Sequence, residues 1–504
     1  MIIENGEWRV ENYELKAFIV FALSIVKGRI VDMEERFNDF EEKRAEVFRE
    51  LVEKAWHGDL DNNDLNGILG SLQTKYGYKT DEISFLRNHM RLLMGLNPRG
   101  DQEFSDELQR IKEFGHLSGP VVSKIGGICK YCNEEVEETQ CYDACKYEAH
   151  IYRREEGPEI IDNQCFSCGN CVAKCSFGAI AEKLEFMPLI NLLKDKNTTV
   201  FAAVAPSIAG QFGDLITLGQ LRTAFRLLGF KDMIEVALFA DILTIKEAFE
   251  FDALVKSKND FFLTSCCCPV WINYTQRQYP KLFANMSPAV SPMIASGRVL
   301  KALYPESKIV FISPCLAKKG EAKDPRLEGA IDFVVTFREL DEIFKTLAIN
   351  LADLPGDEKD QASFAGRVYA RTGGVSFSVK TVVNRIAPRR LIKFKAKRVD
   401  GVKECKAILE DLSQGKDINA NFIEGMGCAG GCVGGPRTLI DVDKATRLAN
   451  EFGEDSLIMT PFDNMNVIKI LEELGFNDIK DIIEKEEADK LFLREVTDIH
   501  NLKH

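Results

Sequence analysis

Short apolar runs, each ending in a polar or proline-containing turn, recur along the chain from about residue 186 onward. The runs cover residues 199–205, 261–263, 309–312 and 333–335, and a helical stretch follows each turn. Buried strands that alternate with helices predict parallel sheets covered on both faces. Because ligands collect beyond the carboxyl ends of such strands, the turns are candidates for a functional site. The pattern therefore predicts an α/β domain.

The chain before residue 186 has two other patterns. Residues 1–118 contain no cysteine and carry apolar positions at helical spacing through 13–27 and 37–55, which predicts an all-α N-terminal domain of unknown role. Residues 119–185 are rich in cysteine and poor in long apolar runs. A segment of that kind depends on bound metal rather than on a large core, so we expect a separate small domain there.

Composition indicates which classes of binding partner and which cellular location to expect. The 504 residues carry 65 Lys and Arg against 78 Asp and Glu, a net charge of -13, which argues against nucleic-acid binding and favours an electron carrier or a small molecule. The apolar run at residues 17–26 is too short to cross a bilayer and no cleavage site follows it. We therefore expect a cytoplasmic protein without a membrane partner, whose 15 cysteines bind metal rather than form disulfides.

The cysteines of the small domain have the spacing of a bacterial ferredoxin. Three cysteines at two-residue intervals followed by a fourth are characteristic of a 4Fe-4S cubane, in which the last cysteine ligates the other cluster. The spacing is Cys165-x-x-Cys168-x-x-Cys171-x-x-x-Cys175, preceded by the looser Cys129-x-x-Cys132 and Cys141-x-x-x-Cys145. The crossed pattern assigns Cys129, Cys132, Cys141 and Cys175 to one cluster, and Cys165, Cys168, Cys171 and Cys145 to the other. The alternative is a pair of structural zinc sites, which also use Cys-x-x-Cys.

Four further stretches fall at the ends of predicted strands or in a glycine-rich turn. They are APS at residues 205–207, TSCCCPVW at 264–271, SPCLAKKGE at 313–321 and EGMGCAGGCVGGP at 424–436. Cys428 and Cys432 are four residues apart, so a single helical turn would place both thiols on one side. The glycines between them allow the backbone to approach a bulky inorganic group.

In these stretches the chain resembles the iron-only (FeFe) hydrogenases. The three cysteine motifs occur in the order of that family, after a ferredoxin-like domain, and the resemblance covers about residues 119–465. It implies an α/β catalytic domain with two lobes of parallel sheet, formed by residues 186–436 and completed by the helical residues 437–504, together with an α+β ferredoxin-like domain. It also implies an H-cluster, a 4Fe-4S cubane joined to a two-iron azadithiolate unit with CO and CN ligands.

The resemblance assigns the cubane to one cysteine of the triplet and to Cys315, Cys428 and Cys432, with Cys432 bridging to the two-iron unit. The triplet leaves two alignments open, because the family has two cysteines between Thr-Ser and Pro. Anchoring on Pro269 makes Cys268 the ligand and Cys267 the proton-relay cysteine. Anchoring on Thr264 instead makes them Cys267 and Cys266. We favour the first alignment, because proline fixes the backbone after the ligand.

Other family positions surround the two-iron unit. Lys318 matches a lysine that donates to one cyanide, and we expect its neighbour Lys319 to be a solvated surface residue. The other cyanide is held in the family by a cradle that the APS stretch matches. Its residues here are Ala205, Pro206 and Ser207. A methionine is retained at Met426, whereas Ser313 stands where the family has methionine.

The expected proton path departs from the family. Aligning the stretch LTIKEAFE places Ala248 where the family has a relay glutamate, and alanine cannot carry a proton. The adjacent Glu247 and Glu250 are candidates for the relay, but we favour an exposed helix carboxylate for each, while Ser287 and Glu321 match other polar positions of the family.

The resemblance implies reversible reduction of protons to dihydrogen, with electrons supplied by a carrier such as ferredoxin and the two-iron unit inserted by hydrogenase maturation proteins. Two alternatives remain. One is a hydrogen-sensing homologue with low turnover, which steady activity with an artificial donor would exclude. The other is a hydrogenase-like iron-sulfur assembly protein without the two-iron unit. Cys405 stands alone in a helical stretch, and we expect it to be a small buried side chain.

Overall fold

The computed structural model describes residues 2–4, 7–9, 40–113 except 59, 119–125, 140–145, 150–153, 157–161, and 164–494 except 176, 265 and 358. At its centre lies a four-stranded sheet in the order β11-β10-β7-β8, in which every pair of neighbours is parallel. Its strands are β7 (Val200–Val204), β8 (Asp232–Glu235), β10 (Lys308–Ser313) and β11 (Phe333–Thr336). All five residues of β7 are buried, as expected for a strand covered on both faces.

A second parallel sheet has the order β12-β13-β9. Its strands are β9 (Phe262–Thr264), β12 (Ala396–Asp400) and β13 (Phe422–Met426). The prediction of parallel sheets with flanking helices is therefore confirmed for this part of the chain. The segments that follow β7, β9, β10 and β13 are the four stretches singled out in the sequence.

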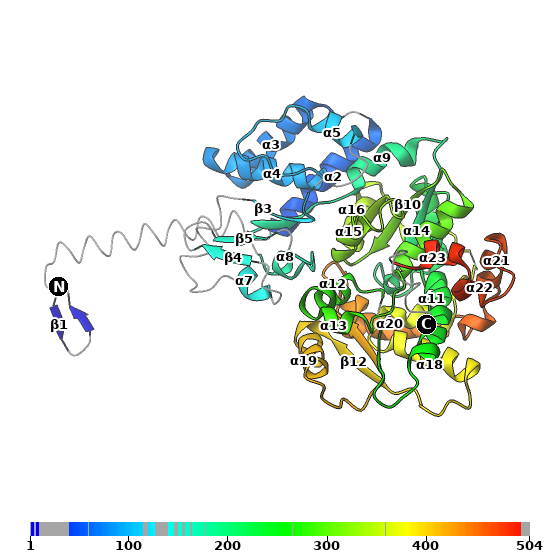
Figure 1. Ribbon diagram of the computed structural model, residues 1–504. Helices are drawn as coiled ribbons and strands as arrows, with labels where there is room; N and C mark the ends of the chain where they lie inside the picture. Colours follow the sequence, from blue (N-terminus) through cyan, green and yellow to red (C-terminus); the bar gives the residue numbers. More distant parts are fainter. Residues whose placement is uncertain are drawn as a thin grey trace.

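Helices cover these sheets on both sides (Figure 1). The α-helices are α9 (Phe186–Lys194), α10 (Leu218–Leu227), α11 (Ala237–Leu254), α12 (Pro269–Gln278), α13 (Pro280–Phe283), α14 (Pro292–Leu303), α15 (Ala317–Ala322), α16 (Phe337–Thr346), α17 (Phe364–Arg367), α18 (Gly374–Ile386), α19 (Gly401–Ser413), α20 (Val442–Glu454), α21 (Met465–Glu473), α22 (Asp481–Glu484) and α23 (Glu486–Phe492). Short 3-10 helices are η2 (Pro206–Ile208), η3 (Leu351–Asp353), η4 (Val368–Ala370), η5 (Cys432–Gly434) and η6 (Pro461–Asp463).

Local sequence explains where several of these helices begin. Pro269 occupies the first turn of α12, where its missing N–H costs nothing. The Thr336 and Glu339 side chains form a reciprocal capping box at the start of α16. Helix α11 is unusual because almost every residue from Ala237 to Ala248 is buried, including polar ones. Such a helix lies inside the domain rather than on its surface.

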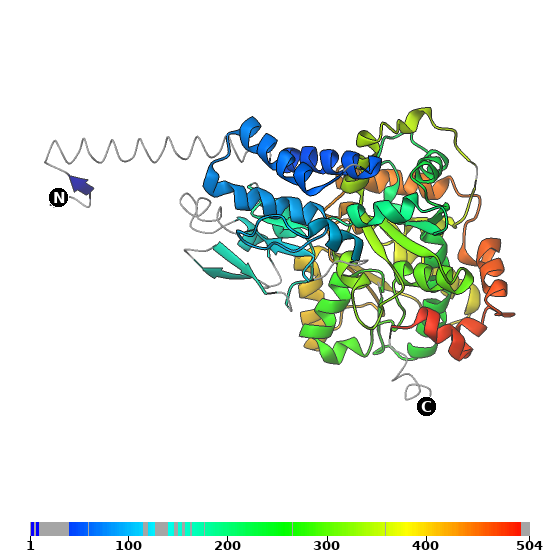
Figure 2. The same ribbon diagram turned by 90° about the horizontal axis from the view of Figure 1, so that it is seen from above.

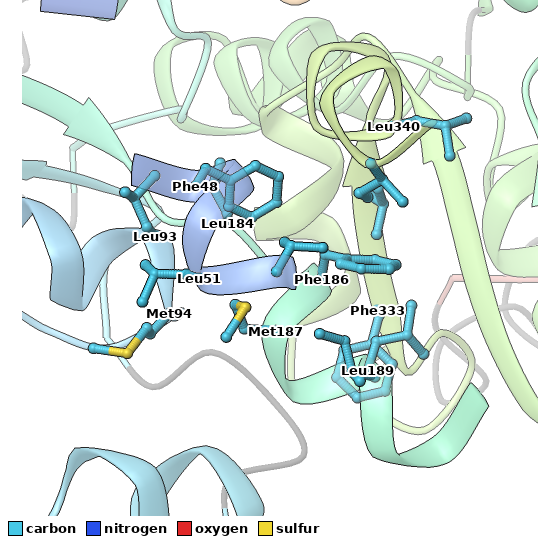
Figure 3. Packing of buried hydrophobic residues seen from close by; sticks show 14 of the residues in the cluster. Phe48, Leu51, Leu93, Met94, Leu184, Phe186, Met187, Leu189, Phe333 and Leu340 are labelled. Carbon is cyan, nitrogen blue, oxygen red and sulfur yellow. The ribbon is translucent and has the colours of Figure 1, made fainter. Parts of the chain in front are cut away.

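The N-terminal helical part consists of α2 (Phe40–His57), α3 (Asn62–Tyr76), η1 (Thr80–Glu82), α4 (Ile83–Leu93) and α5 (Glu107–Glu113). Its apolar residues pack directly on the catalytic part. Figure 3 shows Leu51 and Leu93 beside Phe186 of α9, with Phe333 of β11 further along the same cluster. One continuous hydrophobic core therefore joins residues 40–113 to the first sheet.

The cysteine-rich part contains short elements paired antiparallel. They are β3 (Val122–Lys124) with β6 (Ile180–Glu182), β4 (His150–Arg153) with β5 (Gly157–Ile160), and the helices α7 (Gln140–Ala144) and α8 (Asn170–Lys174). Figures 1 and 2 show it beside the helical part, on one side of the catalytic part. At the chain start, β1 (Ile2–Glu4) pairs with β2 (Glu7–Arg9), so the prediction of an all-α N-terminal domain was wrong for these residues. Within the described residues, no helix is long and apolar enough to cross a bilayer.

Candidate functional site

Four thiols from distant segments lie close together. Cys268 precedes α12, Cys315 follows β10, Cys428 follows β13, and Cys432 begins η5. Burial raises the pKa of Cys432 to about 12 and that of Cys315 to about 11, and proximity to Cys268 adds to both shifts. Burial also raises the pKa of Cys428, which lies near the other three. Mutual influence of this kind requires the four sulfurs to be close neighbours.

The glycine-rich turn between β13 and α20 approaches these thiols with its backbone. Gly427 N–H donates to Cys268 Sγ at 3.2 Å, and a side chain at position 427 would lie 2.8 Å from Val270 Cβ. Gly431 has a φ of 88°, and a Cβ there would lie 2.8 Å from Thr372 N. Glycine is therefore required at both positions, one for close approach and one for the left-handed backbone.

The four thiols are candidate ligands of an iron-sulfur cluster. Among the described residues, no three His, Cys, Asp or Glu side chains converge on a point where one metal ion would be ligated. Four neighbouring cysteines are the ligand set of a 4Fe-4S cluster.

A cavity of about 50 Å³ is lined by Cys432, one of the four thiols. Its lining includes Ala205, Pro206, Ser207, Cys267, Lys318 and Cys432, which the sequence had singled out, and Met293 and Tyr369, which it had not. No partner for Ser207 Oγ is present in the described part of the chain, although this oxygen is buried. A buried hydroxyl without a partner is costly, so the cavity offers a donor to an incoming acceptor.

Lys318 is the buried cation of this cavity. Burial opposes its charge, but Glu321 and the Cys267 thiol raise the pKa of Lys318 above its ordinary value. Lys318 Nζ donates to Glu321 Oε2 at 2.6 Å, and Ser291 Oγ donates to the same oxygen at 3.1 Å. The ammonium therefore stays charged at the cavity wall.

Lys319 is not the surface residue that we expected. Its side chain is fully buried, and its Nζ lies 2.7 Å from Glu339 Oε1 and donates to the Lys183 carbonyl at 2.8 Å. The expectation was wrong because Lys318 and Lys319 leave α15 in different directions, and both directions lead into the protein. Lys319 joins α15 to α16 and to the segment that follows β6.

The triplet cysteines have three different surroundings. Cys268 lies with the other three thiols, and Cys267 lines the cavity together with Lys318. Cys266 faces away from both, toward Glu247 on α11. This placement matches the alignment anchored on Pro269 and not the one anchored on Thr264.

A row of polar groups extends from Cys266. Burial raises the pKa of Glu247 to about 7, with Glu250 adding to the rise and Thr264, Ser287 and Cys266 opposing it. Thr264 Oγ1 donates to Glu247 Oε2 at 2.9 Å. Beyond Glu247, Ser287 Oγ donates to Glu250 Oε2 at 3.3 Å.

The expectation of exposed carboxylates was therefore wrong for Glu247, which is fully buried. The Glu250 side chain is 11% exposed and lies 3.0 Å from Lys246 Nζ. Ala248 packs in the same apolar cluster as Cys267, so its side chain supplies no polar group there. Helical periodicity alone does not reveal that α11 is enclosed as far as Ala248, so the burial of Glu247 could not be predicted from the sequence.

Three further residues are buried near the segments that carry the four thiols. Met426 is buried at the end of β13, and Cys405 donates its S–H to the Met426 carbonyl at 3.2 Å. The expectation of a buried Cys405 is confirmed. Ser313 is buried, and its hydroxyl accepts from the Cys315 N–H at 3.3 Å. The Ser313 hydroxyl thus holds the backbone at Cys315.

The ferredoxin-like cysteines lie beside this site. Burial raises the pKa of Cys168 to about 12, and Cys165, Cys145 and Cys315 reinforce the shift. Cys171 is likewise near Cys168, Cys165 and Cys145, so the structure brings together the four members of one expected cluster. Of the other expected set, Cys141 and Cys175 are described, while Cys129 and Cys132 lie outside the described residues.

Comparison with known proteins agrees with this geometry. The family model of the iron only hydrogenase large subunit, C-terminal domain, matches residues 198–436, the range that contains all four converging thiols. Over these residues the chain is FeFe-hydrogenase-like. The resemblance predicted from its motifs is therefore confirmed.

Individual relatives of this FeFe-hydrogenase-like protein are distant. It is 28% identical to iron hydrogenase 1 of Clostridium pasteurianum over 383 residues, which cover 63% of this chain and 67% of that one. It is 28% identical to the NADP-reducing hydrogenase subunit HndD of Solidesulfovibrio fructosivorans over 329 residues, 55% of this chain and 56% of that one. The match thus spans little more than half the length of HndD.

A solved structure of the FeFe-hydrogenase HydA(deltaEFG) has a TM-score of 0.50 at 21% identity, covering 60% of this chain and 96% of that chain. This likeness shows the fold of the catalytic part. A shorter match, 32% identical over 116 residues and 18% of each chain, is to the cytosolic Fe-S cluster assembly factor NAR1 of Phaeosphaeria nodorum.

Proposed function

We propose that this FeFe-hydrogenase-like protein catalyses the reversible combination of two protons and two electrons into dihydrogen. The observation that carries the proposal is a cavity lined by Cys432, one of four neighbouring thiols, together with Cys267, Ser207 and Lys318. An H-cluster bound there would supply the redox chemistry and the iron that binds hydrogen.

The residues present fit that group. Cys268, Cys315, Cys428 and Cys432 would hold the cubane, and Cys432 also lines the cavity, as a cysteine shared with a two-iron unit would. The Lys318 ammonium and the unpartnered Ser207 hydroxyl provide donors for cyanide nitrogens. The remaining lining is mainly apolar, which excludes water from the reacting groups.

Protons would reach the cavity through the polar row on α11. Cys267 faces the cavity and would exchange the proton with the bound group. Glu247 has a pKa of about 7, which allows it to accept and release protons near neutral pH. Ser287 and Glu250 continue the row toward the partly exposed surface of α11.

Electrons would enter through two 4Fe-4S clusters held by the ferredoxin-like cysteines. Cys168 lies close to Cys315, and a Cβ at the adjacent Gly169 would lie 2.8 Å from Leu316 Cδ1, so the two cluster sites are in contact. A cytoplasmic carrier such as ferredoxin would deliver the electrons, and maturation proteins would insert the two-iron unit.

Infrared spectroscopy combined with hydrogen evolution tests the proposal. Protein matured with the two-iron unit should show carbonyl and cyanide stretches and should evolve hydrogen from a reduced artificial donor. Cys315→Ser should abolish both. Cys405→Ser is the matched control, because this buried thiol lies outside the four, and it should retain both. Matured protein without these bands, or a Cys315→Ser variant with full activity, would refute the proposal.

The match to NAR1 supports a second candidate, an iron-sulfur assembly factor without the two-iron unit. That candidate expects cubanes only, with no carbonyl or cyanide bands after exposure to the maturation machinery. The Ser207 hydroxyl and the Lys318 ammonium at the cavity favour the hydrogenase, because an empty cavity would leave the hydroxyl without a partner.

A further inference from the structure

The helical part at residues 40–113 takes no part in the reaction proposed above, yet it contacts the turn that follows Cys175. Helix α4 supplies His89, whose side chain is buried, and His89 Nε2 lies 2.8 Å from the Gly178 carbonyl oxygen. Because a carbonyl oxygen only accepts, Nε2 is the nitrogen that carries the proton. Burial, with Arg44 nearby, lowers the pKa of His89 well below its ordinary value, so the ring is neutral.

The turn that His89 contacts presents an amide to a cysteine sulfur. Gly178 N–H donates to the Cys175 carbonyl at 3.1 Å, and Ile180 N–H points to Cys175 Sγ at 3.4 Å. Gly178 has a φ of 70°, which favours glycine, and a Cβ there would lie 2.3 Å from Phe40 Cδ1. The geometry of this turn therefore depends on His89 and Phe40 together.

Aromatic packing holds the His89 ring in place. Its centroid lies 4.5 Å from that of Phe40 and 4.5 Å from that of Phe85, and both phenylalanines are buried. The imidazole therefore has little freedom to leave the Gly178 carbonyl, and water is kept away from this side of the turn.

The same helical part also holds the next residues of the chain. Arg44 Nη2 donates to the Glu182 carbonyl at 2.6 Å, and Leu184 N–H donates to the Leu92 carbonyl at 3.0 Å. Arg437 of the catalytic part lies 2.5 Å from the Glu182 carboxylate. The segment from Gly178 to Leu184 is thus fixed by the helical part and the catalytic part at once.

We propose that His89 is a positioning residue for electron entry: by holding the Gly178 carbonyl, it keeps the Ile180 amide directed at the Cys175 sulfur and so sets the reduction potential of the cluster that Cys175 would bind. The inference rests on the proposed function only in requiring that cluster. An N–H donor to a cluster sulfur stabilises the more negative reduced state and raises the potential. The helical part is then a built-in regulator of the electron-entry site.

The test uses the full chain with its 4Fe-4S clusters reconstituted and without the two-iron unit, so that hydrogen turnover is not the readout. His89→Leu removes the donor while it keeps an apolar side chain over the turn. His89→Gln replaces the donor with an amide at a similar distance from the backbone. His57→Leu is the matched control, because His57 is exposed on α2 of the same helical part.

Redox titration monitored by electron paramagnetic resonance should show one midpoint potential shifted to a more negative value in His89→Leu. In His89→Gln the midpoint potential should return most of the way to the wild-type value. His57→Leu should have the wild-type potential. Amide hydrogen exchange at Ile180 should be several-fold faster in His89→Leu. Wild-type potentials in a folded His89→Leu protein would overturn the proposal.

If His89→Leu fails to fold, Phe40→Leu tests the same proposal through amide exchange at Ile180. It loosens the packing of the His89 ring without removing a hydrogen bond, and faster exchange at Ile180 is expected. Exchange as slow as in the wild type would equally contradict the proposal. Absence of carbonyl and cyanide bands after maturation would refute the hydrogenase function and leave this result unaffected.

Discussion

Glu247 should make the protein less stable as the pH rises through neutrality. The carboxyl is fully buried on α11, and its pKa lies at about 7 instead of the ordinary 4.5. The folded state therefore holds this proton more tightly than the unfolded state does. The stabilisation is complete below pH 4.5 and is lost progressively as the pH rises through 7.

The size of the effect follows from the shift. One pH unit corresponds to roughly 1.4 kcal/mol, so the change from 4.5 to about 7 amounts to on the order of 3 kcal/mol between pH 4.5 and alkaline pH. Glu247→Gln keeps an oxygen that can accept from Thr264 Oγ1 but cannot ionise. The variant should lack this contribution to the pH dependence, whereas the contributions of other buried carboxyls such as Asp241 should remain.

Two measurements check this prediction. Anaerobic chemical denaturation between pH 5 and pH 8.5 gives the free energy of unfolding of wild type and Glu247→Gln, and the difference between them should change by about 2 to 3 kcal/mol in favour of the variant. Infrared difference spectroscopy should show a carboxyl C=O band that titrates near pH 7 and is absent in the variant. Glu53→Gln on the exposed face of α2 should follow the wild type. A wild-type carboxyl that titrates near 4.5, or identical pH dependence in both proteins, would refute the reasoning.

Three further changes have defined outcomes. Lys319→Met leaves the Glu339 carboxylate buried without its cation and should lower the free energy of unfolding by about 3 kcal/mol in denaturation experiments, whereas a loss below about 1 kcal/mol would contradict a structural ion pair. Gly425→Ala places a Cβ 2.3 Å from Trp271 Cδ2 and should cost about 1–3 kcal/mol, with unchanged stability as the contrary result. Ser207→Ala should shift a cyanide stretch in the infrared spectrum of matured protein, and coincident spectra would show that its hydroxyl does not reach that ligand.

The sequence determined the parts of this protein that depend on spacing along the chain. Strand periodicity and the turns after each strand predicted the parallel sheets, because both are local properties. The interval pattern from Cys165 to Cys175 predicted a group of thiols, and the structure does bring Cys165, Cys168 and Cys171 together. The order of the later motifs was sufficient to predict the resemblance to the FeFe hydrogenases, because each motif is a short segment with fixed internal spacing.

Only the tertiary structure decided where individual side chains point. Three adjacent cysteines occupy three environments, since the turn between β9 and α12 directs Cys266 to α11, Cys267 to the cavity and Cys268 to the other thiols. Buried Lys319 is paired with Glu339, and buried Glu247 accepts a hydrogen bond from Thr264. In each case the partner lies on a separate element. A charged residue can be buried only where distant segments supply its partners, and local pattern carries no information about those segments. For the same reason, the contact of His89 with the Cys175 turn could be seen only in the folded chain.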